Sequence, residues 1–339
     1  MSVNYSFPAH PARAHPAQLS QFGSLLGVSP AMQEVFRLIE RVGPTEASVL
    51  LTGESGSGKE LAARSIHECS SRKGGPFIAI NCGAIPAGLV EAELFGYEEG
   101  SVNGAVRARA GVFERAQGGT LLLDEVTAMP LEMQTRLLRL LETQKFYRGG
   151  GGIEFASDVR VIASTNRCPL QAVQSGQLRE DLLYRLAVFP VEMPPLRNRG
   201  NDVELLAEHF LAELNAQGGT QKRLSALARM MLKQHSWPGN VRELKNCVER
   251  AYILNDVVLE LSPLIPGAPF RNGAEASDGE RLNIRVGSRI HDMERSLIEA
   301  TLNYFKGNKR RAADALGCSL KTLYNKLNGY SQNQECAQP

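Results

Sequence analysis

Short apolar runs alternate with amphipathic helical segments over the first two thirds of the chain. Residues 1–23 are rich in Ala, Pro, Ser and Gln, so we expect a disordered tail there, and helix signals begin near Pro30. Strands are predicted at 48–52, 77–80, 120–125 and 159–163, with helices from 59, near 87–94 and at 131–142. This alternation predicts an α/β fold, a parallel sheet with helices on both faces.

After Pro194 and Pro195 the pattern becomes all-helical. Apolar residues recur at helical spacing in two segments, at Val203, Leu206, Phe210 and Leu214, and then at Val241, Leu244, Val248 and Ala251. We therefore divide the first part into an α/β unit at 24–196 and a small helical lid at 197–261. Residues 262–284 are rich in Pro and Gly with little periodicity, as is typical of a linker.

A separate all-helical unit is predicted at 285–330, followed by a tail at 331–339. One amphipathic helix carries Ile290 to Tyr304, a second spans 309–316, Gly317 breaks it, and Ser319 can cap a third helix. This order is typical of a helix-turn-helix that reads DNA. We expect Leu320, Leu323 and Leu327 to face inward. The side chains left for bases and phosphates are Lys321, Thr322, Asn325 and Lys326.

Charge supports the assignment of the last unit. The net charge is only +2, but residues 281–330 hold ten Lys/Arg against four Asp/Glu, so the rest of the chain is acidic. A basic C-terminal unit favours nucleic acid as a partner, although a solvated charged face on a small bundle is the alternative.

The cysteines and the hydropathy of the chain indicate the cellular compartment in which the protein works. The six cysteines are scattered without a paired metal spacing, which indicates reduced thiols. No apolar run is long enough to cross a bilayer, and we expect no signal peptide or membrane anchor. The sequence therefore predicts a cytoplasmic protein.

The most specific chemical signal is a phosphate-binding loop between a predicted strand and a predicted helix. Its glycines let backbone N–H groups converge on phosphate oxygens, and its lysine can reach the outer phosphates, so we expect a nucleoside triphosphate. The alternative is a glycine-rich turn in an ordinary α/β domain. The hydroxyl that usually follows the lysine and ligates Mg²⁺ is replaced by a glutamate. The loop residues are Gly53, Glu54, Ser55, Gly56, Ser57, Gly58, Lys59 and Glu60.

Two acids follow the apolar strand at 120–125. Asp124 is the candidate ligand for Mg²⁺, and Glu125 is the candidate base that polarises the attacking water. Alone, such a pair is most often a solvated turn. After a phosphate-binding loop in an α/β pattern, it indicates nucleotide hydrolysis.

From about residue 24 to 330, the chain resembles the bacterial enhancer-binding proteins, the AAA+ ATPases that activate sigma-54 RNA polymerase. The resemblance is carried by the loop 53–60, where Glu after Lys is itself typical, by Glu93-Leu94-Phe95-Gly96, by 118–125 and by the run Trp237 to Leu244. The C-terminal unit is similar to the family's Fis-type helix-turn-helix, which docks on upstream enhancer DNA. The resemblance implies an ATP-hydrolysing activator that remodels the closed polymerase complex.

The resemblance also implies roles for further residues. Asn81 matches the residue that restrains Glu125, and Thr165-Asn166 match the nucleotide-sensing segment called sensor I. Arg242 matches the lid arginine called sensor II. Arg179 and Arg185 match arginine fingers that a neighbouring subunit supplies, although surface arginines are the alternative interpretation. These roles imply a ring, most often a hexamer.

One segment departs from the family pattern. The family's loop Gly-Ala-Phe-Thr-Gly-Ala touches sigma-54, and the aligned residues here are Gly100, Ser101, Val102, Asn103, Gly104 and Ala105. Val102 offers a smaller, non-aromatic surface, and Asn103 replaces a β-branched hydroxyl with an amide. Either the loop has lost sigma-54, or it still binds, alone or with a paralogous co-activator that supplies a normal loop in a mixed ring.

We also expect a receiver-less type, since no phosphoacceptor or ligand-binding module precedes the ATPase, so that control comes from another molecule. Three hypotheses remain. The first is the sigma-54 activator, and the second is a DNA-binding regulator with the same fold that works independently of sigma-54. The third, a general AAA+ remodelling ATPase, does not explain the basic C-terminal unit.

Overall fold

The computed structural model describes residues 21–100, 108–261, 290–305 and 307–335 of the chain. Two compact units are distinguished, residues 1–270 and 271–339, and each is described by itself. Within the described ranges, no helix has both the length and the apolar character needed to cross a membrane. The predicted linker lies outside the described residues.

A five-stranded sheet forms the centre of the first unit, and all its neighbouring strands are parallel, as predicted. Its order is β11-β3-β10-β7-β4. The edge strand β11 was not predicted, because Pro190 removes a ladder donor and weakens the strand pattern. The strands are β3 (Val49–Thr52), β4 (Phe77–Asn81), β7 (Thr120–Asp124), β10 (Arg160–Thr165) and β11 (Phe189–Glu192).

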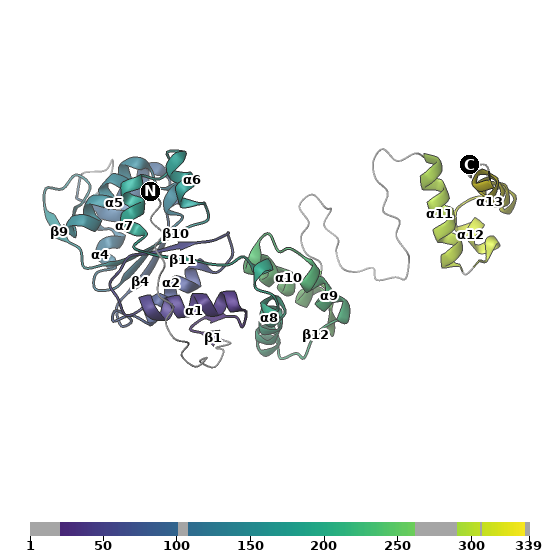
Figure 1. Cartoon of the computed structure of the whole chain (residues 1–339), viewed down its shortest axis with the longest axis horizontal. Coiled ribbons are helices and arrows are strands. Elements are labelled where there is room, and N and C mark those ends of the chain that lie inside the picture. Colours follow the sequence, from purple (N-terminus) through teal and green to yellow (C-terminus); the bar gives the residue numbers. More distant parts are fainter. Residues whose placement is uncertain (1–20, 101–107, 262–289, 306, 336–339) are drawn as a thin grey trace, which may run out of the picture. The chain divides into compact units, whose positions relative to one another are not determined.

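Helices cover both faces of this sheet, as Figure 1 shows. Alternation along β7 divides the two cores, since Leu122 packs with one set of helices and Leu121 and Leu123 pack with the other. The first set is α1 (Pro30–Val42) and α2 (Lys59–Glu68). The second is α3 (Val90–Phe95), α4 (Val112–Arg115), α5 (Leu131–Thr143), α6 (Pro169–Gln174) and α7 (Glu180–Leu186).

Several short elements were not predicted. The hairpin β1 (Gln21–Phe22) and β2 (Leu25–Leu26) begins inside the expected tail, and the ring of Phe22 stacks on Phe36 at 5.5 Å. The tail boundary at residue 23 is therefore wrong, because an aromatic contact orders the chain earlier. The others are β5 (Gly96–Tyr97), β6 (Arg109–Ala110), η2 (Val126–Ala128), β8 (Lys145–Tyr147) and β9 (Glu154–Ala156). The helix predicted near 87–94 begins as the short helix η1 (Ala87–Leu89) and continues as α3.

The lid has its own core, centred on the buried Trp237, whose indole N–H donates to the Leu232 carbonyl at 3.0 Å. Asp202 ties the lid to the start of the chain, because its carboxylate accepts from the Val28 and Ser29 amides at 2.7 and 3.0 Å. The lid comprises η3 (Leu196–Asn198), α8 (Asp202–Gly218), β12 (Arg223–Leu224), α9 (Ala226–Gln234), α10 (Asn240–Leu254) and β13 (Val258–Leu259).

The second unit contains α11 (Ile290–Tyr304), α12 (Lys309–Ala315) and α13 (Leu320–Glu335). The predicted cap is confirmed, since the Ser319 hydroxyl accepts from the Thr322 amide at 3.1 Å. Leu323 is buried in the small core, but the inward placement of Leu320 is wrong because this side chain is 40% exposed at the helix start.

Candidate nucleotide-hydrolysis site

The predicted phosphate-binding loop lies where β3 ends and α2 begins. Gly53, Gly56 and Gly58 have φ of 144°, 74° and 103°, a region that side chains with a Cβ rarely adopt. A Cβ on Gly56 would lie 2.4 Å from the Gly239 carbonyl oxygen, so glycine also permits close approach of the lid. No side chain caps the start of α2. Its first N–H groups and the helix dipole therefore suit an anion.

Lys59 curls back into the loop. Its Nζ donates to the carbonyls of Gly53 at 2.8 Å and Glu54 at 3.2 Å. Burial lowers the pKa of Lys59, while the carboxylates of Glu125 and Asp124 oppose that shift. The loop lysine and the acidic pair thus share one electrostatic site, although they are far apart in the sequence.

Ser57 provides a test of whether the loop suits a bound nucleotide. Its Oγ is buried and finds no hydrogen-bond partner within the described part of the protein. A buried hydroxyl without a partner is costly, and polar groups of a ligand are one way to satisfy it. The orphaned hydroxyl, the uncapped helix and the glycine conformations together fit a polyphosphate group.

Three parallel strands bring polar side chains to their carboxyl ends. Asn81 on β4 pairs in register with Asp124 on β7, and Asn81 Nδ2 donates to Asp124 Oδ2 at 3.1 Å. Ser164 on β10 donates to Asp124 Oδ1. The structure differs here from the prediction, because Asn81 holds Asp124 and not Glu125. Ser164 was missed, since a serine inside an apolar strand carries no distinctive signal.

Glu125 follows Asp124 in the left-handed conformation, with φ of 56°. A non-glycine residue in this conformation is strained and occurs often at functional sites. Glu125 directly precedes η2, and its half-exposed side chain makes no hydrogen bond to cap that helix.

The described residues contain no group of three His, Cys, Asp or Glu side chains that could hold a metal ion. Mg²⁺ usually takes one or two carboxylates and completes its shell with phosphates and water. Asp124, with Glu125 beside it, fits that pattern, so this carboxylate could hold the metal ion of a nucleotide complex.

The lid binds the backbone carbonyls of the phosphate-binding loop. Asn240 Nδ2 donates to the Ser55 carbonyl at 3.1 Å, the Val241 amide donates to the Gly56 carbonyl at 3.0 Å, and Arg199 donates to the Ser57 carbonyl. Asn240 is buried and has φ of 53°, a conformation that asparagine tolerates. Its Oδ1 accepts from the Leu196 amide at 2.8 Å, which secures η3.

Side-chain pairs reinforce this contact. Arg197 donates two hydrogen bonds to the carboxylate of Glu54, at 2.6 and 2.8 Å, and these bonds with that from Asn240 lower the pKa of Glu54 to about 2. Burial lowers the pKa of Arg199 to about 10. Neither arginine was predicted from the sequence. Their position just after two prolines is a weak signal, and the loop groups that they bind, the Glu54 carboxylate and the Ser57 carbonyl, lie far away in the chain.

The predicted sensing residues occupy different environments. Arg242 is exposed and donates to the Ser55 hydroxyl at 3.0 Å, so it reaches the loop from the lid. Thr165 is buried, and its hydroxyl contacts that of Thr127 at 3.2 Å and accepts from the Arg167 amide. Asn166 is exposed. Glu60, in the first turn of α2, is also exposed.

Arg179 and Arg185 lie at the two ends of α7, with exposed side chains. Arg179 pairs with Asp181 at 2.7 Å, and Arg185 donates to the Leu141 carbonyl at 2.7 Å. Neither contacts the phosphate-binding loop among the hydrogen bonds and ion pairs of the described residues. The structure therefore does not bring these arginines into the site of their own chain.

The other predicted surfaces are partly visible. Gly100 has φ of 79°, whereas the remaining loop residues, 101–105, lie outside the described residues. On α13, Lys321, Thr322 and Asn325 are exposed. Lys326 is half-buried and pairs with Glu294 on α11.

The fold and this site define a P-loop ATPase domain of the AAA+ type with a helical lid. Family models match the chain in three consecutive parts: a sigma-54 interaction domain at 25–192, an AAA+ ATPase lid domain at 197–269 and a Fis-family bacterial regulatory protein at 289–330.

Among curated proteins, FlbD of Caulobacter vibrioides is 44% identical over 314 residues, covering 89% of this chain and 69% of that protein. NtrC of Azospirillum brasilense is 41% identical over 352 residues, covering 96% and 73%. The crystal structure of Brucella abortus NtrX in complex with ATP matches with a TM-score of 0.65 and 37% identity, covering 91% of this chain and 69% of that one. The chain belongs to the bacterial enhancer-binding proteins, the sigma-54-dependent transcriptional activators.

Proposed function

We propose that this protein hydrolyses ATP in a site shared between neighbouring subunits and uses that energy to remodel the closed complex of sigma-54 RNA polymerase. The observation that carries the proposal is the convergence of Lys59, Asp124 and Glu125 at one edge of the sheet, beside a loop held by the lid. The ATP-bound structure of NtrX, with the same fold, supports nucleotide binding here.

Each residue has a role that suits its place. Lys59 leaves the loop carbonyls and neutralises the outer phosphates, while the amides at 53–60 hold the phosphate oxygens. Asp124, oriented by Asn81 and Ser164, would hold Mg²⁺, which when bound neutralises charge on the phosphates. Glu125 accepts a proton from the attacking water. Thr165, Asn166 and Arg242 lie where strand β10 and the lid can respond to the bound nucleotide.

We infer that Arg179 and Arg185 act in trans in a ring, most simply a hexamer. Both are exposed, their present partners are weak surface contacts, and none of those partners belongs to the phosphate-binding loop. An arginine that stabilises charge on a transferring phosphoryl group is worth roughly 10³–10⁵ in rate. Turnover should therefore need assembly.

The sequence of the loop 100–105 is the reason for the main alternative to direct activation of sigma-54 RNA polymerase. Its Val102 and Asn103 lack the aromatic ring and the β-branched hydroxyl of the family motif, which favours either a mixed ring with a paralogous co-activator or regulation without sigma-54. Enhancer DNA would be held by α13 through Lys321, Thr322 and Asn325. A protein with these partners works in the cytoplasm.

The test is open-complex formation on a sigma-54 promoter with ATP, for this protein and for Val102→Phe/Asn103→Thr, with ATP turnover measured in parallel. Activity of both proteins supports direct engagement of sigma-54 by the present loop. Activity of the double variant alone shows that the motor is intact and that the present loop has lost its contact with sigma-54. Failure of both, with normal ATP turnover, would favour the regulator that works without sigma-54.

A further inference from the structure

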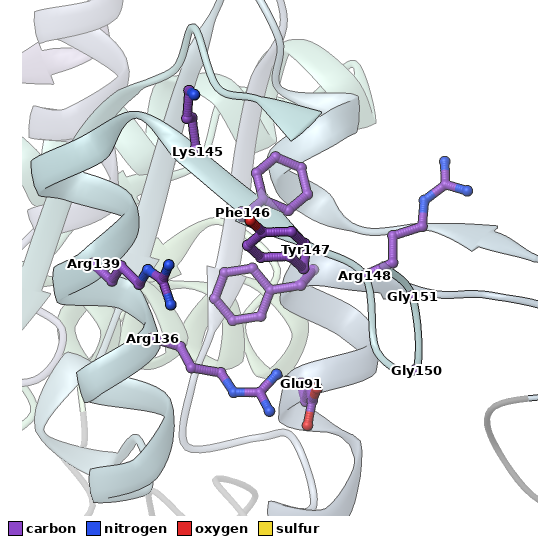
Figure 2. A pocket seen from close by; sticks show the side chains of 10 residues that line it. Glu91, Arg136, Arg139, Lys145, Phe146, Tyr147, Arg148, Gly150 and Gly151 are labelled. Atoms are coloured by element: carbon purple, nitrogen blue, oxygen red, sulfur yellow. Dashed lines mark hydrogen bonds and ion pairs between the residues drawn. The ribbon is translucent and has the colours of Figure 1, made fainter. Parts of the chain in front are cut away.

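A pocket of about 340 Å³ lies away from the nucleotide site, between α5, strand β8 with the turn that follows it, and α3. None of the residues that line it belongs to the phosphate-binding loop or the lid. Its volume falls within the range of about 300–1,000 Å³ that is usual for small-molecule sites. Figure 2 shows that side chains from all three segments line it.

Among the described residues of the lining, basic side chains dominate, four of them against the one acid Glu91. Two of the four are committed elsewhere, because Lys145 pairs with Glu154 at 2.7 Å and Arg148 pairs with Glu114 at 2.6 Å. In Figure 2 these two side chains extend away from the centre of the pocket. The remaining two, Arg136 and Arg139, extend from successive turns of α5 toward it.

Arg139 is exposed and forms no ion pair within the described residues, where its guanidinium instead lies over the ring of Tyr147, 5.9 Å from the centroid. Arg136 pairs with Glu91, and both side chains are partly exposed. Solvent-exposed ion pairs contribute little to stability. A ligand anion can therefore exchange with the Glu91 carboxylate at small cost.

Aromatic rings form the rest of the pocket. Phe95 and Phe146 are buried beneath it with ring centroids 6.1 Å apart, and the Tyr147 ring is 39% exposed. An exposed ring beside a guanidinium suits stacking with a planar group, whereas guanidinium forks suit phosphate oxygens.

We propose that this pocket binds a small phosphate ester that carries a planar ring, such as a nucleoside monophosphate. Its phosphate contacts Arg139 and Arg136, and its ring stacks on Tyr147. Glu91 opposes binding, because its carboxylate occupies Arg136 and repels the phosphate.

The pocket lies beside a turn that is hydrogen-bonded to the segment leading into the loop at 100–105, so a ligand bound there can affect that loop. Within the turn after β8, the Gly149 amide donates to the Gly96 carbonyl at 2.9 Å, and the Gly149 carbonyl accepts from the Glu98 amide at 3.2 Å. Residues 100–105 follow Glu98 almost directly in the chain. A ligand that fixes this turn therefore fixes the base of that loop.

The experiment is calorimetric titration of the full chain with AMP, inorganic phosphate and adenosine, in the wild type and in Lys59→Ala, which weakens the phosphate-binding loop. We expect AMP to bind in the Lys59→Ala protein, more tightly than phosphate, with adenosine weakest. In that background, Arg139→Ala should weaken AMP at least about tenfold, the usual worth of a charged hydrogen bond. Glu91→Gln should strengthen AMP binding about threefold.

Lys145→Gln is the matched control, because it also removes one positive charge from the lining of this pocket, but from a side chain that points away and is already paired. AMP affinity in this variant should stay within about twofold of its parent. Bound AMP should also slow hydrogen exchange of the Gly149 and Glu98 amides. No AMP binding at millimolar concentration in Lys59→Ala, or equal weakening by Lys145→Gln and Arg139→Ala, would overturn the proposal.

Discussion

The two sides of the nucleotide site, the lid side and the side of the α7 arginines, differ in whether residues of the same chain contact the phosphate-binding loop. On the lid side, three successive loop carbonyls, from Ser55 to Ser57, each accept a hydrogen bond from the lid or from the segment leading into it. On the other side, the partners of Arg179 and Arg185 within the described residues are neighbours on α7 and α5. The loop is thus fixed by buried contacts, while the arginines remain at the surface.

This difference predicts that nucleotide binding and ATP hydrolysis depend on different sides of the site. Contacts within the chain shape the loop before any partner arrives, so we expect a single subunit to bind nucleotide. The charge that stabilises phosphoryl transfer has to come from another copy. Variants on the two sides should therefore fail in different ways.

The largest effect is expected on the arginine side. Arg179→Ala and Arg185→Ala should each lower ATP turnover by roughly 10³–10⁵ without loss of folding, since both side chains are exposed. Steady-state hydrolysis and the thermal unfolding midpoint measure the two properties. Arg37→Ala, an exposed arginine on α1, serves as control and should behave as the wild type. Normal turnover in both finger variants would exclude this assignment.

Glu125→Gln should lower turnover by roughly 10²–10⁴ and leave ATP binding intact, because the amide keeps the shape but cannot accept the proton. Single-turnover kinetics and equilibrium binding measure the two steps, with the exposed Glu132→Gln as control. Mixing Glu125→Gln with Arg179→Ala should restore part of the activity, since some interfaces then combine an intact acid with an intact arginine. If the mixture stays inactive although the two proteins co-assemble, the shared site is wrong.

The parts of the site that were predictable from sequence are those whose spacing is local. The loop 53–60 and the pair Asp124-Glu125 follow apolar strands directly, so both motifs and their strands were found together, and the parallel sheet was confirmed. Residues that act through long-range contacts were missed. Arg197, Arg199 and Ser164 find their partners only after folding, and no local pattern marks them.

The detailed contacts show the same limit. The strand register places Asn81 opposite Asp124, and this pairing decides which acid the amide holds. Both residues were predicted to belong to the site, but the register of their strands was not predicted. Leu320 was placed inward by helical spacing, yet a first-turn residue lies at the edge of the small core and remains exposed.

On the lid side, Asn240→Ala should act on stability more than on chemistry. The substitution leaves the Leu196 amide and the Ser55 carbonyl without the hydrogen bonds that Asn240 makes to them, and it places alanine at a φ of 53°. We therefore expect the unfolding free energy to fall by about 3 kcal/mol. Urea denaturation measures it. Asn246→Ala, on the exposed face of the same helix, should change stability by less than about 0.5 kcal/mol. Equal losses would mean that the contact with the loop contributes nothing specific.

The smallest effect concerns His67, which links α2 to β7 through a 2.9 Å hydrogen bond between Nδ1 and the Thr120 hydroxyl. Burial lowers the pKa of His67 below its usual 6.5, with Arg64 and Arg160 adding to the shift and Glu68 opposing it. Below that pH the unfolded chain binds a proton that the folded protein resists, so stability should fall as pH drops through 6.5.

His67→Gln removes this titration, and its unfolding free energy should therefore decline less than that of the wild type between about pH 7.5 and about pH 5.5. The exposed His209→Gln should decline as the wild type does. Urea denaturation at the two pH values measures the difference. Parallel declines in His67→Gln and the wild type would show that this buried imidazole accepts its proton as easily in the folded state as in the unfolded one.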